Sequence, residues 1–90
     1  MLVNFTGSIV SADGKVIYQR VSGTIDHRRG KNFSEWDGEL TIESGEMPSL
    51  FQGFVVTDAG RRAEMFATEM NFGSNTIAFQ GSGPPPFDHP

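Results

Sequence analysis

A short pattern with a central glycine recurs along most of the chain and constrains its fold more than any other feature. The pattern is apolar-x-Gly-x-apolar, and its glycines lie 16, 15, 15 and 28 residues apart. The last copy lacks its final apolar residue, and Ala67 lies midway through the long interval. The glycines are Gly7, Gly23, Gly38, Gly53 and Gly81. Each copy fits a β-strand that turns its glycine and the flanking apolar residues to one face.

The clearest copy is Trp36-Asp37-Gly38-Glu39-Leu40-Thr41-Ile42, where apolar and polar positions alternate without a break. Extending the alternation to the other copies, and ending each strand at Gly, Pro, Asn or Asp clusters, predicts six strands. Their predicted ranges are 2–10, 16–26, 36–42, 50–57, 61–70 and 76–82. In this phase Ala63, Met65 and Ala67 point inward in the fifth strand.

Two alternative readings remain open at this stage. Asp37-Gly38 could form a two-residue hairpin turn, although this would discard the glycine repeat. Residues 61–70 could form an amphipathic helix, because several apolar residues follow helical spacing there. These residues are Ala63, Phe66, Ala67 and Met70.

A glycine on the core face of each strand needs a reason, since glycine weakens a strand. A sheet of few strands that closes on itself must coil sharply, and inward glycines permit that bend. The fold class is therefore all-β: a single small closed or nearly closed antiparallel barrel of about six strands in meander order with inward glycines. The competing interpretation treats them as unrelated turn glycines. We expect one domain over residues 1–83, followed by a Pro-rich tail over 84–90, and no room inside for a small-molecule ligand.

Composition sets further expectations. The chain has 90 residues, which is one domain, and it has no cysteine. Its N-terminus lacks a basic residue, and no apolar segment approaches the ~20 residues of a membrane span. We expect a cytoplasmic protein without a membrane segment.

No residue pattern points to an enzyme, a cofactor or a metal centre. His27 is expected in a polar loop exposed to water. Two separated histidines in a chain without cysteine do not make a recognisable set of metal ligands. Asp37, Glu39 and Glu43 are expected on the outer face of their strand, as a solvated face that discourages edge pairing. The chain lacks a Gly-x-Ser-x-Gly elbow and a phosphate-binding glycine loop. We therefore expect a protein that is not an enzyme and needs no cofactor.

Basic side chains form two short clusters, so nucleic-acid binding is kept as the alternative function. The candidate basic residues are Arg28, Arg29, Lys31, Arg61 and Arg62. Phe33, Trp36, Tyr18 and Phe72 are the candidate stacking groups beside them. The formal net charge of −4 and the inward phase of Trp36 count against this function.

The strand phases also leave large apolar side chains on the outside of the fourth and fifth strands. They are Leu50, Phe54, Val56, Phe66 and Met70. A contiguous exposed apolar patch usually marks an interface, so we expect self-association or binding of a protein partner there. The competing expectation is that the tail, Pro84 to Phe87, covers this face.

Overall fold

Six β-strands make up most of the chain in the computed structural model, which describes residues 2–29, 34–43, 45–49 and 51–86. They are β1 Leu2–Val10, β2 Val16–Arg29, β3 Ser34–Ile42, β4 Gln52–Thr57, β5 Arg62–Asn71 and β6 Thr76–Ser82. The described residues include no helix, so the helical alternative for residues 61–70 is wrong. The hairpin turn at Asp37-Gly38 is also wrong, because both residues lie inside β3.

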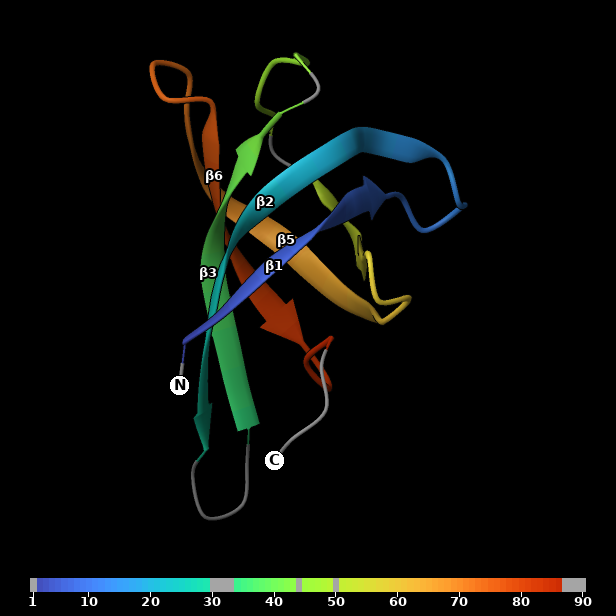
Figure 1. Cartoon of the computed structure of the whole chain (residues 1–90), viewed down its shortest axis with the longest axis vertical. Helices are drawn as coiled ribbons and strands as arrows, with labels where there is room; N and C mark the ends of the chain where they lie inside the picture. Colours follow the sequence, from blue (N-terminus) through green and yellow to red (C-terminus); the bar gives the residue numbers. More distant parts are fainter. Residues whose placement is uncertain (1, 30–33, 44, 50, 87–90) are drawn as a thin grey trace.

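The strands close into an antiparallel barrel in the order β1-β2-β3-β6-β5-β4 (Figure 1). Each half of the chain forms a three-stranded meander, and the halves join along two seams, β3 with β6 and β1 with β4. This confirms the fold class predicted from the glycine repeat. The order is meander-like, and the chain crosses the barrel between β3 and β4, which are not neighbours.

The repeated glycines lie at positions where the barrel leaves no space for a side chain. Gly38, for example, lies between Trp36 and Leu40, each of which is only 1% exposed. A Cβ atom added to any of the five would lie under 3.0 Å from another atom of the barrel. At four of them that atom is a backbone carbonyl oxygen of the adjacent strand, and at Gly81 it is the indole of Trp36. The absence of a side chain lets the strands curl this tightly.

Buried apolar side chains from all six strands fill the interior. They are Phe5, Ile9, Tyr18, Val21, Ile25, Trp36, Leu40, Ile42, Val55, Ala63, Met65, Ile77 and Phe79. Phe79 makes edge-to-face contacts with Phe5 and Trp36, with ring centroids 6.1 and 6.2 Å away. The Trp36 indole N–H donates to the Gly83 carbonyl at 2.9 Å. Trp36 thereby fixes the residues that follow β6.

Tyr18 is buried, although regular alternation along β2 would turn Ile17 inward in its place. The register explains the change: Gly7 pairs with Val21 but Ile9 pairs with Tyr18, so β2 has one extra residue. This β-bulge reverses the phase of the strand. Ile17 keeps a half-buried position against the core.

His27 does not lie in a water-exposed loop, so that prediction was wrong. β2 continues to Arg29 and pairs in register with β3, which places His27 opposite Trp36. His27 is 4% exposed and follows the same inward phase as Gly23 and Ile25. The polar sequence after Asp26 concealed the continued pairing.

Candidate functional site

The outer surface of β4 and β5 carries an apolar row flanked by two opposite charges. Buried Gly53 and Val55 point inward, so Phe54 and Val56 face outward in half-buried positions. In the ladder, Phe54 pairs with Glu64, Val56 with Arg62 and Gln52 with Phe66. We call this surface the β4–β5 face and define it by Phe54, Val56, Arg62, Glu64 and Phe66.

The two phenylalanine rings of this face are diagonal neighbours. Because Phe54 pairs with Glu64, Phe66 lies two residues further along β5 on the same side. Diagonal positions on a sheet face are about 7–8 Å apart, within reach of aromatic side chains. Phe66 is 39% exposed, and the residues opposite it on both neighbouring strands are the glutamines Gln52 and Gln80. Phe66 is therefore an exposed aromatic side chain with a polar residue on each neighbouring strand.

Arg62 lies at the edge of this apolar row and also packs against one of its rings. Its guanidinium carbon lies 4.2 Å from the centroid of the Phe54 ring, which is a cation–π arrangement. The stacked guanidinium covers part of Phe54, so the exposed apolar area is smaller than alternation alone predicts. Val10 of β1 extends the row, since it pairs with Phe54 on the other side of β4.

The expected placement of Met70 beside Phe66 does not hold. The β5–β6 register shifts between Ala67 and Glu69, and Met70 consequently pairs with the buried Ile77. The extra residue reverses the phase, so Met70 does not continue the row of Phe66, although it is 37% exposed. Leu50, the remaining predicted member, lies outside the described residues.

The expectation that the tail lies across this face gains no support from its last described residue. Pro86 is buried in a different hollow, between β1 and the turn that joins β4 to β5. Neither Phe54 nor Phe66 lines that hollow. Phe87 lies outside the described residues.

The predicted basic residues are not brought together. Arg28 lies on β2, whereas Arg61 precedes β5 and Arg62 is its first residue. Two strands separate β2 from β5 in either direction around the barrel. The side chains of Arg29 and Lys31 lie outside the described part of the chain. Of the candidate stacking groups, Trp36 and Tyr18 are buried. These observations do not favour nucleic-acid binding.

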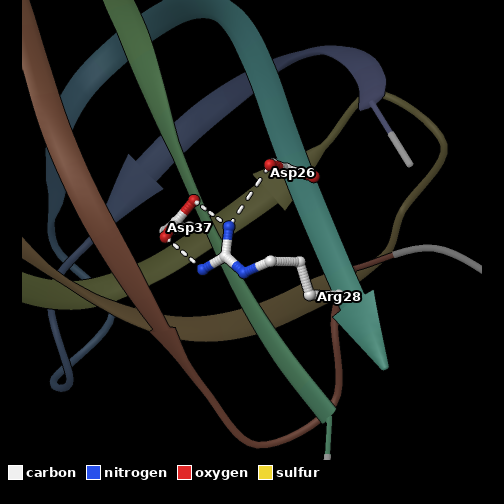
Figure 2. A network of polar contacts seen from close by, with 3 residues as sticks. All are labelled: Asp26, Arg28 and Asp37. Atoms are coloured by element: carbon white, nitrogen blue, oxygen red, sulfur yellow. Dashed lines mark hydrogen bonds and ion pairs between the residues drawn. The ribbon is translucent and has the colours of Figure 1, made fainter. Parts of the chain in front are cut away.

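Arg28 takes part in a carboxylate network, shown in Figure 2. Asp26 and Asp37 are directly opposite on β2 and β3, and Arg28 bridges them, with nitrogen–oxygen distances of 3.2 and 2.6 Å. The hydrogen bond and the charge of Asp37, more than those of Asp26, raise the pKa of Arg28 above its ordinary value. Two like charges placed opposite each other destabilise a sheet. The positive charge of Arg28 offsets this repulsion, so Arg28 has a structural role between the two aspartates.

Two hollows mark the surface. A mostly apolar one of about 320 Å³ lies between the N-terminal half of β1 and the β4–β5 turn. A polar one of about 230 Å³ lies outside β3, β6 and β5, where Glu39 and Glu69 flank Ala78 on its two neighbouring strands. No cluster of metal-binding side chains occurs among the residues described. Within the same residues, no helix is long and apolar enough to span a bilayer.

Comparisons with protein-family models, with curated proteins and with solved structures find no match. Function is therefore inferred from the geometry alone. Sequence reasoning found Phe54, Val56 and Phe66, because alternation is a local signal. It did not connect Arg62 and Glu64 with them, since this requires the β4–β5 register. The sequence signal that could have given this register is the short Asp58-Ala59-Gly60 turn, because a short turn fixes which residues of the two strands are opposite each other.

Proposed function

We propose that this chain is a protein-binding module that self-associates through the β4–β5 face. The observation that carries the proposal is the diagonal pair Phe54 and Phe66, set beside the alternating charges of Arg62 and Glu64. Exposed apolar side chains that lie together usually mark a contact surface. Each large apolar side chain contributes roughly 1.5–3 kcal/mol when it becomes fully buried.

A second copy of the chain fits this face because the charges complement themselves. Arg62 and Glu64 lie two residues apart on the same side of β5. In a twofold interface, any contact from one residue to another is repeated in reverse. An axis through the face between these residues would therefore bring each Arg62 against Glu64 of the partner copy, which gives two opposite-charge contacts in the dimer. Association also costs translational and rotational freedom, so the expected dimer has a dissociation constant in roughly the micromolar range.

The direct test is sedimentation velocity over a concentration series. The wild-type chain should approach twice its mass of 9.8 kDa as concentration rises. Phe54→Glu combined with Phe66→Lys should stay monomeric, with an unchanged circular dichroism spectrum and with a melting temperature close to that of the wild-type monomer at low concentration. Phe72→Lys is the matched control, because Phe72 is 56% exposed and lies outside the face.

A charge exchange sharpens the test. Arg62→Glu should weaken the dimer, and adding Glu64→Arg should restore it, because the exchanged pair is again self-complementary. Wild-type chain that remains monomeric at millimolar concentration would contradict self-association. Unfolding of the Phe54→Glu/Phe66→Lys variant would show that these rings belong to the core.

A further inference from the structure

Within the part of the chain that the structure describes, the barrel wall is open along part of β1. This strand spans Leu2–Val10, but β4 pairs only with its Gly7–Val10 portion. The last bond across the seam runs from the Asp58 N–H to the Thr6 carbonyl at 2.9 Å. Among the described residues, the portion before Thr6 pairs with β2 alone. The N-terminal half of β1, seen beside β2 in Figure 1, is therefore an edge strand in an otherwise closed barrel.

The bond from Asp58 fixes the direction of the edge groups. In an antiparallel pair, successive residues direct their N–H and C=O groups alternately to the two neighbours. Since the Thr6 carbonyl points to the β4 side, Asn4 directs both its N–H and its C=O to the same open side. The segment 2–6 contains no proline, lysine or glutamate, the residues that commonly protect an edge from pairing.

The described part of the tail cannot complete this ladder. Pro84, Pro85 and Pro86 have no backbone N–H, so they cannot donate to the Asn4 carbonyl. Pro86 packs instead into the apolar hollow beside the edge.

That hollow lies where the inward side chains of an added strand would point. Its volume is about 320 Å³, and Val3 and Phe5, the inward residues of this part of β1, line it together with Ile25 and Ala59. A strand paired with Asn4 would alternate in phase with β1. Its residues opposite Val3 and Phe5 would therefore place apolar side chains in the hollow.

The outer side of the edge carries a negative charge. The exposed Asp58 carboxylate accepts a hydrogen bond from the Thr6 hydroxyl at 2.5 Å, so it is held beside the edge. The chain as a whole has a net charge of −4. Outward residues of an added strand next to Asp58 would thus be stabilised by positive charge.

We propose that the β1 edge around Asn4 binds an extended segment of a partner protein by strand addition, and that this segment alternates apolar with basic residues. Main-chain hydrogen bonds to the N–H and C=O of Asn4 hold the segment, while the hollow and Asp58 select its alternate side chains. This site is separate from the β4–β5 face and does not depend on the proposed self-association.

The test uses a fluorescent heptapeptide that alternates lysine and valine, followed by anisotropy and by amide NMR shifts. Binding should move the Asn4 and Thr6 amide signals and protect the Asn4 amide from hydrogen exchange. The same peptide with glutamate in place of lysine should bind at least about tenfold more weakly, and so should a peptide N-methylated at its lysines, which loses the ladder donors.

Two variants with controls locate the site. Asn4→Pro removes a backbone donor that faces the open side, and an edge strand tolerates proline at such a position. This variant should lose binding of the peptide. The control variant Asn4→Ser keeps the donor and should keep binding. Ala59→Phe should fill the hollow and weaken binding, whereas Ala12→Phe, in the exposed β1–β2 turn, should not. If circular dichroism shows that Asn4→Pro unfolds, Ala59→Phe and the N-methylated peptide decide the outcome.

Several results would overturn the proposal. The first is that the lysine–valine peptide does not bind. The second is that the N-methylated peptide binds as tightly as the unmethylated one. The third is that a folded Asn4→Pro variant binds the peptide as tightly as the wild type does. Binding that needs removal of residues 87–90 would assign the edge to the chain's own C-terminus. Conversion of a dimer to a monomer by Asn4→Pro would assign it to a second copy.

Discussion

Gly38 shows at the scale of one residue why this sheet can close. A Cβ atom there would lie under 3.0 Å from the Thr24 carbonyl oxygen on β2 and from the Phe79 ring on β6. The ring could turn aside, but the backbone oxygen belongs to the ladder and cannot. The position therefore excludes every residue with a side chain unless β2 and β3 move apart.

Gly38→Val should consequently destabilise the barrel by roughly 1–3 kcal/mol or more, the usual cost of overpacking a core. Urea denaturation followed by tryptophan fluorescence measures this, because Trp36 lies two residues away and is buried. Gly73→Ala is the control: only the Asn71 side chain lies within 4 Å of its added Cβ, at 3.3 Å. Equal unfolding midpoints for Gly38→Val and the wild type would refute the role given to the inward glycines.

The phase of most residues was predictable from the sequence, because strand alternation depends only on neighbours in the chain. Gly38 and Val55 are examples. Tyr18 and Met70 were not predictable, since each follows an extra residue that reverses the phase. A bulge cannot be recognised in the sequence where both faces of the strand carry apolar as well as polar residues, because the alternation is then already irregular. His27 was missed for a related reason, because polar composition outweighed the continued pairing with β3.

At the scale of elements, Tyr18 anchors the linker that carries the chain from β3 to β4. Its hydroxyl accepts a hydrogen bond from the Ser49 N–H at 2.8 Å and lies 3.2 Å from the Met47 carbonyl. Its ring packs edge-to-face against Phe51, with centroids 5.8 Å apart. The linker crosses between strands that are not neighbours, so these contacts fix its course.

Tyr18→Phe should cost about 1 kcal/mol of stability, because it leaves the Ser49 N–H without its partner while preserving the ring. Hydrogen exchange of the Ser49 amide should accelerate in the same variant. Ser49→Ala, which keeps the N–H and loses only the side-chain bond at 2.9 Å, should have a smaller effect. Identical Ser49 exchange rates in Tyr18→Phe and the wild type would show that the hydroxyl does not anchor the linker.

At the scale of the whole molecule, the β1–β4 and β3–β6 seams determine which strands are neighbours and where a strand edge stays unpaired. The β1–β4 seam joins residues about half the chain apart, such as Ile9 and Val55, and ends where the β1 edge opens. Such a long-range pairing carries no local sequence signal. The glycine repeat predicted closure but not the partner of each terminal strand. The β4–β5 face could be predicted in part, whereas the β1 edge and its hollow follow only from the observed strand order.

The most direct test of this strand order is the set of short distances between Hα atoms in NMR spectra. Ile9 and Val55 are directly opposite but do not exchange hydrogen bonds, and Glu39 and Ala78 are in the same situation across the β3–β6 seam. Such pairs have Cα atoms about 4.5 Å apart, so strong Hα–Hα cross-peaks are expected for both. Cross-peaks between β3 and β4 and between β1 and β6 in their place would contradict the barrel described here.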